Sequence, residues 1–100
     1  MYKKLVLLLL LFSPYCMAER LTGPIKISRV FSEGTSTGGF YSEEGFPQCK
    51  WGVMYIDLGN ETGKAQFSIL LAAKVSNSSI TRIDYDIDGS GICKIKGLHF

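Results

Sequence analysis

Short stretches in which apolar and polar residues alternate recur along the chain, and each predicts a β-strand. In the first stretch Ile25 and Ile27 share one face, with Lys26 between them on the other. Val30 and Phe31 then break the alternation, which predicts a bulge or bend. Clusters of Gly, Ser, Asn or Pro separate the stretches and predict turns. The strands predicted in this way span residues 24–31, 40–43, 51–58, 81–87 and 93–100, with a change of phase at Gly97 in the last.

Between residues 63 and 76 the period lengthens to three or four residues, which predicts an α-helix. Thr62 is expected to cap its start and Asn77 to end it. A helix with so few polar residues is usually buried on more than one side. Its apolar side chains form a stripe of mostly small residues, Ala65, Ile69, Ala72 and Ala73, and a set of large ones, Phe67, Leu70 and Leu71.

The predicted order of elements is therefore β-β-β-α-β-β, with no internal repeat. A mainly β domain with one helix between its third and fourth strands has the order of the OB-fold, a five-stranded Greek-key barrel. We expect this fold for a single domain over residues 19–100.

The first 18 residues have the three zones of a signal peptide. Two lysines precede an unbroken apolar run over residues 5–12, which is shorter than the roughly 20 residues of a membrane-spanning helix. Cys16 and Ala18 place small residues where signal peptidase reads them, so we expect cleavage before Glu19. The alternatives are a lipoprotein signal that ends at Cys16 and an uncleaved anchor. The pattern predicts an exported protein, periplasmic or secreted, without a membrane span after cleavage.

Removal of this segment changes the net charge of the chain. The full sequence has 11 basic and 9 acidic residues, and Lys3 and Lys4 would leave with the signal peptide. The mature domain would then be neutral, without a cluster of Lys and Arg. Such a domain has no electrostatic surface for nucleic acid or for anionic lipid.

Loss of Cys16 would leave two cysteines, Cys49 and Cys93, in the mature domain. Two cysteines in an exported chain most often form a disulfide. A metal or redox pair is the alternative, but it needs C-x-x-C spacing or histidine partners, and His99 is the only histidine. We therefore predict a Cys49–Cys93 disulfide.

No pattern in the sequence indicates catalysis or a cofactor. Asp84, Asp86 and Asp88 open like a calcium loop, D-x-D-x-D-G, but the twelfth position, which needs a bidentate carboxylate, is Ile95. His99 has no evident partner as a general base. We expect a protein that is not an enzyme and has no catalytic residue, metal or cofactor.

An aromatic-rich segment begins in the second predicted strand and is the best candidate for ligand binding: Phe40, Tyr41, Phe46 and Trp51. A sugar ring has an apolar face and a polar edge, so aromatic rings beside hydrogen-bonding groups suit a carbohydrate. The alternative is that Trp51 packs on the disulfide and the other rings fill the end of the barrel. The ligand-binding hypothesis assigns Tyr41, Glu44 and Trp51 to the site.

The second half of the chain carries a family resemblance, over roughly residues 49–100. Gly63-Lys64-Ala65 and Leu70-Leu71-Ala72-Ala73-Lys74, followed by a strand, Cys93 and the final Leu98-His99-Phe100, resemble small exported bacterial proteins. These proteins are related to the B subunits of AB5 toxins, notably of the subtilase cytotoxin type. The Shiga toxin B subunit has a similar order of helix, strand, cysteine and last strand.

This resemblance implies an OB-fold, a ring-shaped homopentamer, binding of cell-surface glycans, and a catalytic A subunit as a partner. No sugar-contact residue of the toxins matches a position here. A five-stranded barrel covers one side of the predicted helix, so we expect self-association through Phe67, Leu70 and Leu71, unless the loop over residues 32–48 covers them. A protein-interaction domain without glycan binding, such as an inhibitor or a stabilising subunit, is the alternative function.

Overall fold

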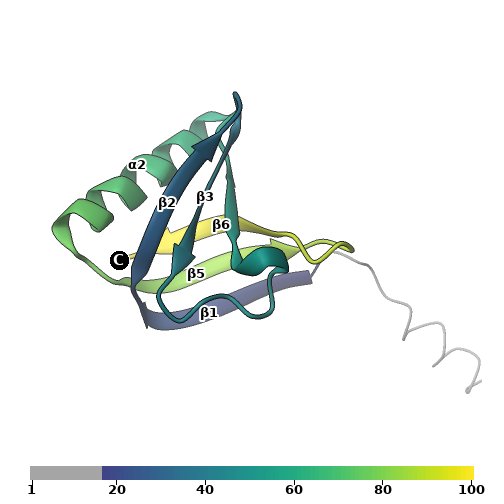
Figure 1. The fold of residues 1–100 in the computed structure, drawn as a ribbon, viewed down its shortest axis with the longest axis horizontal. Coiled ribbons are helices and arrows are strands. Elements are labelled where there is room, and N and C mark those ends of the chain that lie inside the picture. Colours follow the sequence, from purple (N-terminus) through teal and green to yellow (C-terminus); the bar gives the residue numbers. More distant parts are fainter. Residues whose placement is uncertain (1–16) are drawn as a thin grey trace, which may run out of the picture.

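The structure is a computed structural model that describes residues 17–100. Six strands, one α-helix and one short 3-10 turn make up this part of the chain (Figure 1). The elements are β1 (Met17–Ile25), β2 (Ile27–Glu33), β3 (Thr37–Ser42), η1 (Lys50–Gly52), β4 (Met54–Asp57), α2 (Glu61–Ser76), β5 (Ile80–Ile87) and β6 (Cys93–His99).

All six strands belong to one mixed sheet in the order β1-β5-β6-β4-β3-β2. Only β4 and β6 run parallel, and every other neighbouring pair is antiparallel. The two strands at the ends of this order, β1 and β2, are consecutive in the chain with Lys26 alone between them. The sheet therefore bends so far that its first and last strands meet at one corner, at the lower left of Figure 1.

The predicted mainly β domain with a single helix is confirmed within residues 17–100, but its first strand was predicted too short. The strand expected over residues 24–31 is in fact the end of β1 and most of β2. β1 begins at Met17, and its pairs with β5 run from Met17–Ile87 to Ile25–Ile80. Within β1 only Leu21 and Ile25 pack on the core, and its sequence, MAERLTGPI, lacks the alternation that predicts a strand.

The expected change of phase in the last strand is present. The pairing of β5 with β6 shifts between Asp84 and Tyr85, so that Gly97 lies opposite Asp84 and Ile95 lies opposite Tyr85. Residues 1–16 of the predicted signal peptide lie outside the described residues, whereas Met17 and Ala18 pair with β5. No helix within residues 17–100 has the length and apolar character that crossing a membrane requires.

The N-cap of α2 differs from the one expected. Asn60, not Thr62, is the N-cap, and its side-chain oxygen accepts a hydrogen bond from the Gly63 N–H at 2.7 Å. Asn77 ends the helix in the left-handed conformation, as predicted. A side chain at Gly63 would collide with the Asp57 carbonyl, so this glycine lets the first turn lie directly against the end of β4.

One face of α2 covers the core of the bent sheet. Leu70 and Ala73 are buried, and Phe67 packs beside them. The predicted disulfide is confirmed: Cys49 and Cys93 are bonded, with 5.5 Å between their Cα atoms. The core that these residues join consists of Ile27, Phe40, Phe46, Met54, Ile56, Ile80, Ile83 and Tyr85.

Candidate functional site

Three aromatic rings and one guanidinium gather on the outer face of β2, β3 and β4, and we call them the aromatic face: Arg29, Phe31, Tyr41 and Tyr55. Phe31 lies between the other two rings, 5.7 Å from Tyr41 and 6.0 Å from Tyr55 between centroids. The Arg29 guanidinium carbon lies 4.4 Å from the centroid of the Tyr41 ring. The rings are half-buried, so each contacts the protein on one side and solvent on the other.

Strand register explains why these side chains meet. Arg29 lies opposite Tyr41, and Gly39 lies opposite both Phe31 and Tyr55 in its two neighbouring strands. A Cβ at Gly39 would come within 2.8 Å of the Phe31 ring, so the absence of a side chain there makes room for that ring. Gly39, in the middle strand, therefore leaves the space in which the Phe31 ring lies between the two tyrosines.

A hollow of about 320 Å³ adjoins the aromatic face at Tyr55. It opens between the β2–β3 turn, the end of β4 and the loop before β6. Asp57 on its rim is fixed by hydrogen bonds from Gly59 N–H at 2.8 Å and Asn60 Nδ2 at 3.2 Å. Its polar and charged lining consists of Ser36, Thr37, Tyr55, Asp57 and Lys94.

The phenol of Tyr55 is held in its neutral form. Partial burial, and then the negative charge of Glu33 and the nearby Tyr41, raise the pKa of Tyr55 above its ordinary value. A neutral phenol both donates and accepts hydrogen bonds. Tyr55 therefore belongs to the aromatic face through its ring and also lines the adjoining hollow, with a hydroxyl that can donate and accept hydrogen bonds.

The structure separates the three residues that were predicted to bind a ligand. Tyr41 belongs to the aromatic face. Glu44 is exposed in the loop after β3, beside a different hollow of about 340 Å³ between that loop and β1. Trp51 lies in η1 and is 67% exposed, so its side chain is not part of the core. Phe40 and Phe46 do fill the core, as that alternative expected.

Sequence reasoning missed Arg29, Phe31 and Tyr55 as members of the site. Phe31 and Tyr55 come from separate strands that meet only through β3, and the expected β-strand over residues 51–58 began too early. The one signal available was the pair Gly38-Gly39 beside Phe40-Tyr41, because glycine inside a strand often marks close approach of another group.

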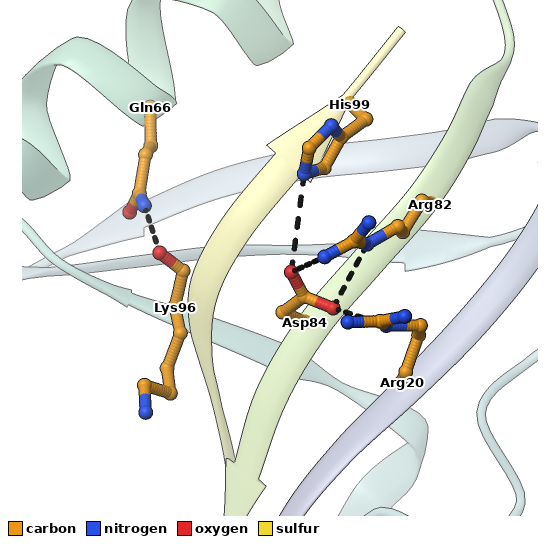
Figure 2. A network of polar contacts seen from close by, with 6 residues as sticks. All are labelled: Arg20, Gln66, Arg82, Asp84, Lys96 and His99. Carbon is orange, nitrogen blue, oxygen red and sulfur yellow. Dashed lines mark hydrogen bonds and ion pairs between the residues drawn. The ribbon is translucent and has the colours of Figure 1, made fainter.

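A polar cluster on the other half of the sheet, over β1, β5 and β6, is centred on Asp84 (Figure 2). Arg82 donates to both carboxylate oxygens, from Nε at 3.1 Å and Nη2 at 2.9 Å, and Arg20 of β1 donates from Nε at 3.1 Å. His99 Nε2 lies 3.9 Å from the same carboxylate. Since β1, β5 and β6 each contribute a side chain, the cluster ties three adjacent strands together.

These contacts determine how Asp84 titrates. The hydrogen bonds from Arg82 are the largest effect and lower the pKa of Asp84. Desolvation opposes them, and the hydrogen bond and charge of Arg20 lower the pKa further. A carboxylate with a lowered pKa stabilises the folded state above its unfolded pKa, about 3.9, and loses that contribution as the pH falls through the folded pKa.

We expect Asp84→Asn to be less stable than the wild type at pH 7, with the difference narrowing below about pH 4, where the wild-type carboxylate also loses its charge. Urea unfolding of the wild type and the variant between pH 7 and pH 2 measures this difference in stability. Asp86→Asn is the matched control, because Asp86 has no ion-pair or hydrogen-bond partner for its side chain among residues 17–100. A pH-independent difference for Asp84→Asn would contradict the role assigned to this carboxylate.

The aspartates of the D-x-D-x-D-G pattern point to different partners. Asp84 faces the two arginines, whereas Asp88 Oδ1 accepts hydrogen bonds from the backbone N–H groups of Ser90 and Ile92, at 2.8 and 3.0 Å. Among residues 17–100, no three His, Cys, Asp or Glu side chains come together as metal ligands would. His99 lies beside Asp84 at the surface, where the arginines hold that carboxylate.

The predicted oligomer-interface residues are divided between the core and the surface. Leu70 is fully buried, so it is not available to another subunit, and Phe67 packs on the core and is only partly exposed. Leu71 is 43% exposed. The exposed apolar side chains of α2, which we call the outer helix face, are Ala65, Ile69, Leu71, Ala72 and Val75.

Comparison of the chain with protein-family models, with curated proteins and with solved structures finds no match. The resemblance to AB5 toxin B subunits therefore stays a prediction. The aromatic face and its adjoining hollow carry the functional argument by their own geometry.

Proposed function

We propose that the protein is an exported, non-catalytic binding module of OB-fold type that recognises carbohydrates through the aromatic face. The support for the fold is topological. If β1 and β2 are two halves of one strand bent at Lys26, five strands remain, with α2 between the third and fourth. The first strand then pairs with both the second and the fourth, and the third runs parallel to the fifth. This connectivity agrees with the strand order of a five-stranded Greek-key barrel of OB type.

The position of the aromatic face supports the choice of ligand. OB-folds bind oligosaccharides and oligonucleotides on the face of their second and third strands, beside the loops that join the first two and the last two strands. Here these strands are β3 and β4, which carry Tyr41 and Tyr55. The adjoining hollow includes Ser36 from the first of these loops and Ile92 from the second.

The chemistry of this surface favours a sugar over a nucleic acid. Rings stack on the apolar face of a sugar, and the hydroxyls, Asp57 and Lys94 of the hollow hydrogen-bond its polar edge. A nucleic acid needs many cationic contacts to its phosphates, whereas Glu33 and Asp57 place negative charge next to Tyr55. The rings flanked by the polar hollow are the observation that carries this proposal.

Alanine at Tyr55 is expected to weaken carbohydrate binding at least tenfold, which corresponds to about 1.4 kcal/mol for a central aromatic contact. Tyr55→Phe keeps the ring and loses only the hydroxyl, so it should retain part of the affinity. A glycan array identifies the ligand, and calorimetry with the strongest array ligand measures each variant.

The matched control is Phe100→Ala, which removes an exposed aromatic ring outside the aromatic face. It should bind as the wild type does. Absence of any array signal from the disulfide-bonded wild type would count against the proposal, and equal losses in Tyr55→Ala and Phe100→Ala would show that the aromatic face is not the site.

A homo-oligomer is part of the same proposal. Ile69, Leu71 and Val75 are large apolar residues left exposed on one helix, and contiguous apolar surface of this kind often marks an interface. Burial of this face against copies of the same chain agrees with the ring that the toxin resemblance implies, and a catalytic A subunit would be a further partner. The same surface favours the second candidate function, a protein-interaction domain of the periplasm or the secreted fraction, whose partner would cover α2 instead.

A further inference from the structure

The side chain of Trp51 is exposed although its backbone is held firmly in place. It is the only tryptophan of the chain and is 67% exposed. Its φ of 59° lies in the left-handed region, which bulky side chains rarely adopt, and Gly52 follows with a φ of 67°. A large apolar side chain that is exposed on a left-handed backbone position is unfavourable for the isolated domain, and such features concentrate at binding sites.

Neighbouring contacts hold the backbone that carries this ring. Cys49, two residues earlier, is bonded to Cys93, and the Lys50 N–H donates to the Gly91 carbonyl at 2.8 Å. The Gly52 N–H closes the turn on the Cys49 carbonyl at 3.0 Å. The 3-10 turn η1 is thus tied to the start of β6 and to the loop between β5 and β6, near which it lies in Figure 1. Trp51 projects into solvent from a rigid support.

The surroundings of the ring suit a sugar. The Lys50 ammonium nitrogen lies 4.7 Å from the centroid of the Trp51 ring. An ammonium group there can donate hydrogen bonds to hydroxyl oxygens at the edge of a sugar stacked on the ring. The pair therefore repeats, with one ring and one cation, the combination that Tyr41 and Arg29 form on the aromatic face.

A single loop connects this pair to the proposed site. Gly91 accepts the hydrogen bond from Lys50, and the next residue, Ile92, lines the hollow beside Tyr55. Lys94, which follows on β6, lies opposite Tyr55 in the parallel pair and lines the same hollow. The two surfaces are neighbours across the loop before β6.

We infer that Trp51 and Lys50 form a second sugar subsite, so that the ligand is an oligosaccharide that extends from the aromatic face across the loop to Trp51. This inference rests on the proposed function, because it needs the first subsite at Tyr55. A single sugar occupies the subsite at Tyr55, and a longer glycan occupies both.

A glycan array with ligands graded from one to six sugar residues tests the inference on the wild type, Trp51→Ala, Tyr55→Ala and Phe100→Ala. Trp51→Ala should lose at least tenfold in affinity for long ligands and bind short ones as the wild type does. Tyr55→Ala should lose affinity for both long and short ligands, and Phe100→Ala should lose affinity for neither. An intact Cys49–Cys93 disulfide and unchanged circular dichroism verify that each variant is folded, and Trp51→Phe, which keeps a stacking ring, should restore part of the lost affinity.

Tryptophan emission supplies an independent readout, because Trp51 is the only tryptophan. The longest ligand bound on the array should shield Trp51 from quenching by acrylamide, and its single-residue fragment should not. Long ligands bound equally by the wild type and Trp51→Ala, with no shielding, would overturn the second subsite and leave the aromatic face standing. Absence of binding by the wild type to every ligand would overturn both.

Discussion

Replacement of both cysteines by alanine should lower the free energy of unfolding by about 4 kcal/mol, the chain-entropy value for a cross-link across a sequence separation of 44 residues. This loss is large for a domain of this size, whose total stability is expected to be about 5–15 kcal/mol. The location of the disulfide adds to the expected loss of stability. Cys93 lies opposite Met54 in the parallel pair of β4 and β6, where only two residue pairs are in register. The disulfide therefore joins the sheet where its pairing is shortest.

Urea unfolding of the Cys49→Ala, Cys93→Ala variant measures the loss. Reductant should reduce the stability of the wild type by a similar amount and leave the variant unchanged. A loss under about 1 kcal/mol would mean that the core alone holds β4 and β6 together.

Two adjacent leucines of α2 should respond very differently to truncation. Leu70→Ala removes a fully buried side chain and should cost about 3–5 kcal/mol, which includes the cavity it leaves. Leu71 is 43% exposed, so Leu71→Ala should change stability by under about 1 kcal/mol. Chemical denaturation of the two variants compares the same substitution one position apart. Equal costs would contradict the helix orientation described here.

The same position separates folding from self-association. Leu71→Glu places a charge on the outer helix face without touching the core, so it should leave the fold intact and dissociate an oligomer built on that face. Native mass spectrometry of the wild type and of this variant gives the result. A wild type that is monomeric at micromolar concentration would contradict the proposed interface.

For the helix, the periodicity of the sequence predicts its position but not its orientation. The period of three to four residues located α2 to within two residues at its start and correctly at Asn77. It could not orient the helix, because apolar residues occupy nearly the whole circumference and both candidate faces satisfied the pattern. Packing decides between them, since Gly63 must face the Asp57 carbonyl, and Phe67, Leu70 and Ala73 then follow on the same side.

The candidate site was less predictable, for a related reason. Tyr41 was identified because aromatic residues cluster around it in sequence, but its contacts with Arg29 and Phe31 depend on the register of β2 against β3. That register shifts between Ile27 and Arg29, and residue alternation does not predict which neighbours result. Trp51 was expected to begin a strand, since the sequence offers no sign of the left-handed turn beyond the Gly that follows it. Local patterns thus specify elements, whereas register and turn geometry specify which side chains share a surface.

The corner at Lys26 has a consequence for the order in which the chain can fold. β2 can pair with β3 as soon as both exist, because only a three-residue turn separates them. β1, although it comes first in the sequence, must wait for β5, and the Arg20–Asp84 contact joins residues 64 positions apart. Pairing over such a separation costs loop entropy before it contributes any contact, which slows folding. We therefore expect the β2–β3–β4 half to form early and β1 to be the last strand to attach.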